Sequence, residues 1–353
     1  TIHASADVFG PTSNHSSSDF RRCNKHQGRL RVFRNRPWFY TVTIETMTSM
    51  QHKFGALDLI RAGLQDLDKA RTLFDELHND GIDDDRMRLL LTTLEKACDP
   101  DVALSNLVDI IKVVQSQGED FTNIIADENS FIRLITVLGV SDEMGKLMRF
   151  RPELVEAAAN DACESHLYNH EQRRAHVLKS VGADPNDHTM PTASLPLAEA
   201  ATALRKTYRK QLAAIMAQDA TANDPITIQP RISTELSDLA DAALEGALAI
   251  ARHEVDGSEH VRFAIIGMGK LGAQELNYVS DVDLIYVVEP ADADTNGMTL
   301  SRVGTKMATT LQRVCQSVIM GVAEPTLWQI DGGLRPEGKD GPLVRRLESH
   351  EAY

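Results

Sequence analysis

The fold of this chain is decided by residues 263–288, which read FAIIGMGKLGAQELNYVSDVDLIYVV. An apolar run leads into a glycine-rich turn, a short polar segment follows, and a second apolar run begins directly after Asp281. Short apolar runs bounded by glycine and turn residues are typical of buried strands. We therefore expect strands at 262–266 and 284–288, and a third at 327–331, in an α+β arrangement.

Three acidic residues lie at the ends of the expected strands. Asp281 and Asp283 flank Val282, so they share one face of their strand, about 7 Å apart. Two carboxylates at this spacing can hold a hard divalent cation together. Asp283 would otherwise place a charge inside an apolar strand, which is costly without a partner or a metal. Asp331 ends the third apolar run and completes a set of three if the strands are neighbours.

The glycines between the two strands suit phosphate binding. Gly267, Gly269 and Gly272 allow backbone N–H groups to approach a phosphate closely. A second loop, rich in Gly and Pro, follows Asp331 and contains Arg335 and Lys339, which are placed to bind phosphate oxygens. A phosphate cradle beside a metal-binding acid pair indicates nucleotidyl transfer.

Two other functions stay open at this point. The GxGxxG at 267–272 is also found in NAD(P)-binding oxidoreductases, but that fold needs a full helix after the glycines and an acidic residue about 20 positions on. Only eight residues separate Gly272 from Asp281, so the spacing argues against it. The remaining alternative is a non-catalytic helical docking module with a decayed nucleotide site.

Residues 51–255 have the apolar spacing of helices, and 256–353 form the expected catalytic core. Asp99-Pro100 predicts a helix start, 181–196 a linker, and 197–217 a long helix. Asn223–Pro230 predicts a break, followed by a helix capped by Ser233 or Thr234. On the long helix, a cationic patch is predicted to be a solvated face; it consists of Arg205, Lys206, Arg209 and Lys210.

Composition limits the class of protein. The 353 residues carry a net charge of −14, with 42% hydrophobic and 5% aromatic residues. An acidic chain with few aromatic residues disfavours nucleic-acid binding, and no apolar run reaches the roughly 18 residues of a membrane span. Four distant cysteines without a CxxC pair indicate a reducing, cytoplasmic setting; they are Cys23, Cys98, Cys163 and Cys315.

The first 46 residues differ from the remainder. They hold seven Lys or Arg against three acidic residues and show no sustained helical period. We interpret 1–50 as disordered or mis-called leader sequence, because a transit peptide would show a clearer amphipathic helix.

Two motifs carry a resemblance to a known family. GMGKLGAQELNYVSDVDLIYVV at 267–288 and IDGGLRPEGKDGPLV at 330–344 resemble the glutamine synthetase adenylyltransferase/adenylyl-removing enzymes, especially the actinobacterial type. These enzymes are part of the polymerase-β-like nucleotidyltransferase superfamily. The chain departs from many relatives at Ala273, where Gly is common, and at Gly333, where an Arg often precedes Leu-Arg-Pro.

The resemblance implies a bifunctional enzyme of which this chain is an N-terminal fragment. That part would remove AMP from a tyrosine of glutamine synthetase by phosphorolysis, giving ADP, and an ATP-dependent adenylyltransferase domain would lie downstream. Asp281, Asp283 and Asp331 would bind Mg²⁺. A PII-type signalling protein or another nitrogen-status effector is the implied regulator. The implied nucleotide and phosphate ligands are Gly267, Gly269, Lys270, Gly272, Ser280, Arg335 and Lys339.

Overall fold

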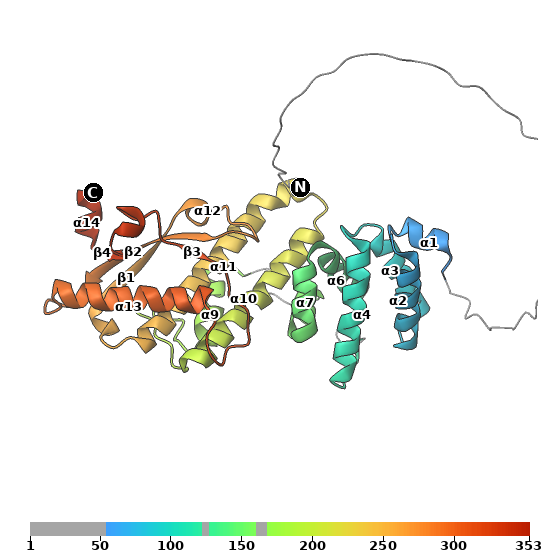
Figure 1. The fold of residues 1–353 in the computed structure, drawn as a ribbon, viewed down its shortest axis with the longest axis horizontal. Helices are drawn as coiled ribbons and strands as arrows, with labels where there is room; N and C mark the ends of the chain where they lie inside the picture. Colours follow the sequence, from blue (N-terminus) through green and yellow to red (C-terminus); the bar gives the residue numbers. More distant parts are fainter. Residues whose placement is uncertain (1–53, 122–126, 160–167) are drawn as a thin grey trace, which may run out of the picture. The chain divides into compact units, whose positions relative to one another are not determined.

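A computed structural model describes residues 54–121, 127–159 and 168–353. The described chain is mostly helical and ends in a small mixed sheet with flanking helices (Figure 1), which is the α+β fold expected from the sequence. The predicted leader at 1–50 lies outside the described residues, as do Cys23 and Cys163.

The first part of the described chain contains helices only. Most of them begin at an Asp or Ser whose side chain accepts a backbone N–H of the first turn, which satisfies one of the donors left free at a helix start. The predicted start at Asp99-Pro100 is confirmed, since Asp99 accepts from Val102 N. These helices are α1 (Ala56–Arg61), α2 (Leu67–Asn79), α3 (Asp84–Leu94), α4 (Pro100–Ser116), α6 (Glu128–Val140), α7 (Asp142–Phe150) and α8 (Glu153–Ala159).

Three further helices precede the sheet: α9 (His170–Ser180), α10 (Leu197–Ala220) and α11 (Pro225–Glu254). The predicted break up to Pro230 is wrong, because α11 runs through that proline. Its cap is Asp224, which accepts from Ile226 N and Thr227 N. The missing N–H of Pro230 removes only one bond, close to the helix start where few bonds have yet formed.

Residues 181–196 contain no helix or strand, yet they pack closely. Val181, Ala183 and Ala193 are buried, and Ala193 N donates to Ala249 O of α11 at 3.0 Å. Arg252 Nη1 of the same helix donates to Pro191 O at 2.9 Å. This segment is therefore held along α11 by its backbone.

The sheet contains β1 (Val261–Gly267), β2 (Val282–Pro290), β3 (Ile330–Asp331) and β4 (Val344–Arg345). β1 pairs antiparallel with β2, while β3 and β4 each pair parallel with β2. The expected third strand at 327–331 is shortened to its last two residues. The remaining elements are η2 (Ser258–His260), α12 (Gly269–Gly272), α13 (Gly297–Gln316), η3 (Gly338–Asp340) and α14 (Leu347–Ala352).

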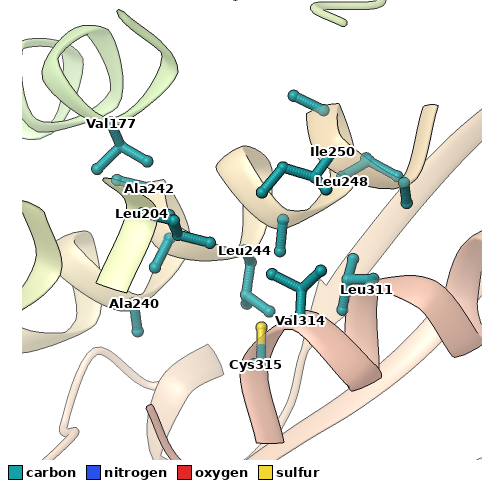
Figure 2. Packing of buried hydrophobic residues seen from close by; sticks show 14 of the residues in the cluster. Val177, Leu204, Ala240, Ala242, Leu244, Leu248, Ile250, Leu311, Val314 and Cys315 are labelled. Atoms are coloured by element: carbon teal, nitrogen blue, oxygen red, sulfur yellow. The ribbon is translucent and has the colours of Figure 1, made fainter. Parts of the chain in front are cut away.

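Two hydrophobic cores are present in the described chain. One is formed by the early helices, and the other joins α9, α10 and α11 to the sheet and α13. Figure 2 shows Val177 of α9, Leu204 of α10, Leu244 of α11 and Val314 of α13 within the second core. Helix α10 contributes to both cores, with Ala213, Met216 and Ala217 in the first. The inward residues of β2 bury one face of the sheet and leave Asp283 on the other.

The predicted solvated patch on α10 is half wrong. Lys206 and Lys210 are exposed, whereas Arg205 and Arg209 are only 1% and 6% exposed. Residues four apart lie on the same side of a helix, so the two arginines face inward together while the two lysines face outward.

Candidate functional site

The site begins with the strand that carries Asp283. Along β2 the residues alternate between buried and half-buried, and Val282 and Leu284 are both fully buried. Asp283 therefore points to the opposite face, where it is half-buried, and Asp281 is exposed just before the strand. The pairing of Gly267 with Leu284 places the glycine turn at the same end of the sheet.

Asp331 comes to this face from a distant part of the sequence. Asp283 and Asp331 are register partners in the parallel pairing of β2 with β3. Carboxylate oxygens of Asp281, Asp283 and Asp331 all lie within 4.8 Å of one another. Gly333 N donates to Asp331 Oδ1 at 2.6 Å, which orients this carboxylate. The structure thus brings the three acidic residues together.

The electrostatics of this group favour a cation. Burial raises the pKa of the Asp283 carboxyl, and the neighbouring Asp281 and Asp331 raise it further, while Lys270 lowers it. Three carboxylates at this distance repel one another unless a positive charge is added between them. Oxygen ligands in such a cluster are the set that Mg²⁺ prefers, so these residues fit a hard divalent ion.

The glycine turn lies directly against Asp283. Met268 N donates to Asp283 O at 2.9 Å, and Gly269 has φ of +52°. A Cβ added to Gly269 would collide with Asp283 Oδ2, and one added to Gly272 would collide with Gly267 O. Both positions therefore require glycine for close approach, and Gly269 also for its left-handed backbone. Lys270 is exposed beside the turn, and Ser280 is half-buried just before Asp281.

This geometry contradicts the dinucleotide-binding alternative. The helix after the glycines, α12, is only four residues long, and β1 and β2 are antiparallel. A dinucleotide-binding unit needs a full helix connecting two parallel strands. The NAD(P)-binding oxidoreductase is therefore excluded for these glycines.

Arg335 is used within its own loop. Its guanidinium donates to Gly332 O at 2.6 Å, Gly341 O at 3.1 Å and Lys339 O at 3.1 Å. These bonds close the loop that follows β3, so Arg335 has a structural role whether or not it contacts phosphate. Lys339 lies exposed in η3 on the same loop.

The sequence analysis missed the residues that support β3. Gln316 Oε1 at the end of α13 accepts Ile330 N at 2.7 Å, and Val282 N donates to Gln329 O at 2.9 Å. Arg205 and Arg209 of α10 donate to carbonyls of the segment before β3, those of Ser317 and Thr326. One signal in the sequence indicated that these arginines are buried: each directly follows a residue of the apolar helix face, Leu204 or Tyr208.

A second group that could hold a metal lies on α9 and α11: His170, Asp238 and Asp241. His170 Nδ1 is 3.4 Å from Asp238 Oδ1. Burial raises the pKa of Asp241 to about 6. Asp241 lines a cavity of about 580 Å³ between α11 and the inward side of β1. The position of His170 Nδ1 beside the Asp238 carboxylate gives this group a contact that needs no metal.

Comparisons with known proteins agree with the motifs. The family model described as glutamate-ammonia ligase adenylyltransferase matches residues 131–353. A protein of Bifidobacterium longum (strain DJO10A) named bifunctional glutamine synthetase adenylyltransferase/adenylyl-removing enzyme is 71% identical over 307 residues, covering 87% of this chain. Proteins with the same name from Cutibacterium acnes and Leifsonia xyli are 36% and 38% identical, each over 84% of the chain.

The chain spans 28–29% of the length of these three relatives. Within the part of the chain that the structure describes, no helix combines the length and apolarity needed to cross a membrane.

Proposed function

The chain belongs to the glutamate-ammonia ligase adenylyltransferase family, and we propose that it carries a nucleotidyltransferase centre that regulates glutamine synthetase through the adenylyl group. The observation that carries this proposal is the convergence of Asp281, Asp283 and Asp331 beside the glycine turn. The relatives are named as enzymes of glutamine synthetase adenylylation, which supports glutamine synthetase as the substrate.

We further propose that this centre removes the adenylyl group by phosphorolysis. A phosphate oxygen attacks the phosphorus of the adenylyl-tyrosine, the bond to the tyrosine oxygen breaks, and that oxygen takes a proton. The products are ADP and the unmodified tyrosine. The resemblance to the N-terminal catalytic domain supports this direction over ATP-dependent attachment. A PII-type signalling protein or another nitrogen-status effector stays a proposed partner.

The residues have distinct roles in this reaction. Asp281, Asp283 and Asp331 would hold Mg²⁺, which when bound supplies charge neutralisation at the phosphoryl oxygens. The glycine turn and the exposed Lys270 orient the phosphate groups, and Ser280 lies where its hydroxyl can donate to them. Gly269 keeps the turn in contact with Asp283, so phosphate and carboxylates share one site.

The test is phosphate-dependent release of ADP from adenylylated glutamine synthetase by the protein that carries this chain. Asp281→Asn with Asp283→Asn is expected to abolish release, because the site loses two of the three negative charges that would hold a hard cation. Asp294→Asn, at an exposed acidic residue between β2 and α13, is the matched control and should leave release unchanged. Undiminished activity in the double variant would reject the metal assignment.

The same assay separates the two directions. Release of ADP that requires inorganic phosphate supports removal, whereas incorporation of AMP from ATP into unmodified glutamine synthetase would assign this centre to attachment. Neither activity, together with intact binding to glutamine synthetase, would favour the docking module.

A further inference from the structure

The position of Asp331 depends on a connection that has no regular structure. Residues 317–329 join α13 to β3 and contain no helix or strand. β3 itself pairs with β2 through only two residues, Ile330 opposite Val282 and Asp331 opposite Asp283. So short a pairing does little to hold a carboxylate against two others that repel it, and the connection needs further support.

Arg205 of α10 supplies much of that support. Its Nη2 donates to Val314 O and to Ser317 O, both at 2.7 Å, and its Nη1 donates to Glu324 O at 2.9 Å. Val314 and Ser317 end α13, so the guanidinium caps the carbonyls at the negative end of that helix. One side chain thus fixes the start and the middle of the connection.

Arg209, one turn further along α10, holds the following part. Its Nη2 donates to Thr326 O at 2.6 Å. Next to it, the Tyr208 hydroxyl accepts Trp328 Nε1 at 3.1 Å, and the two rings meet edge to face. Thr326 is five residues before Asp331, so α10 holds the chain almost to the start of β3.

Burial explains why these contacts matter. A buried guanidinium is costly unless its N–H groups are bonded. Here the acceptors are backbone carbonyls: Ser317, Glu324 and Thr326 of the connection, Val314 of α13, and Arg205 of α10 itself. The buried carboxylate nearby belongs to Glu324, 3% exposed, which forms an ion pair with Arg151 between α7 and α8. Displacing the connection would remove three acceptors from two buried cations, the carbonyls of Ser317, Glu324 and Thr326.

We propose that Arg205 and Arg209 are positioning residues of the metal centre: by holding residues 314–326 they fix Asp331 beside Asp281 and Asp283. This inference rests on the proposed metal-binding role of the three carboxylates. It predicts that weakening the α10 contacts lowers metal affinity although no metal ligand is changed.

The experiment measures Mn²⁺ binding to the chain by electron paramagnetic resonance, with Mn²⁺ as the probe. Arg209→Met is expected to weaken binding about tenfold, the usual size for loss of a residue that supports metal ligands. Lys210→Met, at the exposed neighbour on α10, is the matched control and should bind as wild type. Arg209→Lys keeps a buried charge and one donor, and is expected to bind with intermediate affinity.

Thermal unfolding of each variant is recorded, and affinities are compared at a temperature where all are folded. If Arg209 only stabilises the fold, its variants bind Mn²⁺ like wild type at that temperature. Wild-type affinity in both Arg209 variants, with affinity lost in Asp331→Asn, overturns the positioning role and leaves the proposed function intact. If Asp281→Asn with Asp283→Asn also binds Mn²⁺ like wild type, the metal centre itself is rejected, and the positioning role with it.

Discussion

Asp331 lies directly opposite Asp283 in parallel register, although 48 positions separate them in the sequence. Replacing Asp331 with Asn keeps the shape of the side chain and removes one of three negative charges. We expect Mn²⁺ affinity to fall by roughly tenfold or more, because ligand charge sets the affinity of oxygen sites. Equilibrium titration of the folded chain measures this. Equal affinity in Asp331→Asn and in the exposed-site variant Asp294→Asn would show that Asp331 is no ligand.

Gly269→Ala tests the contact between the glycine turn and the acidic site. The left-handed backbone at φ +52° costs Ala about 1–2 kcal/mol, and the added methyl group meets Asp283 Oδ2. We expect a lower unfolding temperature and at least roughly a tenfold loss of ADP release, since small displacements at a reacting site have large effects on rate.

The control for this substitution is Gly297→Ala at the start of α13. An added Cβ there meets nothing within 4 Å, and Gly297 is not among the glycines with positive φ. Its activity should match wild type. A Gly269→Ala variant with wild-type activity would contradict the close packing of the turn against Asp283.

Asp241→Asn should stabilise the protein in a pH-dependent way. Burial raises the pKa of Asp241 to about 6, above the ordinary 3.8. Its contribution to stability is therefore full below pH 4 and is lost as the pH rises through 6. Asn mimics the protonated form, so the variant should gain about 1–2 kcal/mol above pH 7, after allowance for partial solvent screening, and nothing below pH 4.

Denaturant unfolding at pH 4 and pH 8 measures this difference. Asp294→Asn, at an exposed position, should show the same change in unfolding free energy at both values. A gain for Asp241→Asn that is equally large at pH 4 would point to a cause other than ionisation.

Pro230→Ala should also stabilise the protein. Pro230 lies inside α11 and cannot donate to the carbonyl four residues earlier, that of Ile226. Alanine restores this donor and has the highest helix propensity, so we expect a gain of about 1–3 kcal/mol in unfolding free energy. Pro225→Ala is the comparison: at the first position of the helix the N–H has no partner in any case, and little change is expected. Equal effects at the two prolines would count against this explanation.

The sequence predicted the group of three acidic residues better than it predicted β3 and the connection that holds Asp331. Alternation along 281–288 sufficed to place Asp281 and Asp283 on one face, because strand periodicity is local. The approach of Asp331 depended on its strand being a neighbour, and the pairing of β2 with β3 supplies that condition. The extent of β3 could not be predicted in this way. Its pairing ends after two residues, and the apolar Leu327 and Trp328 belong instead to a connection held by α10.

The errors on α10 and α11 have a common cause. Local preferences predict a break at Pro230 and a solvated face for the arginines at 205 and 209. Tertiary contacts decide both cases. α11 packs against α9, α10 and α13 along its length, and the carbonyls at the end of α13 supply acceptors for a buried Arg205. The contacts that decide both cases come from residues distant in the sequence.

Helix α10 belongs to two hydrophobic cores at once, with Leu204 and Ile215 in one and Ala213 and Met216 in the other. A fragment that starts at Leu197 would expose the apolar residues of α10 that pack against the early helices. A fragment that ends before Leu197 would lose those residues from the core of the early helices. The minimal autonomous folding unit among the described residues therefore spans both cores. Attempts to dissect the nucleotidyl-transfer centre from the helices before it are expected to yield insoluble halves.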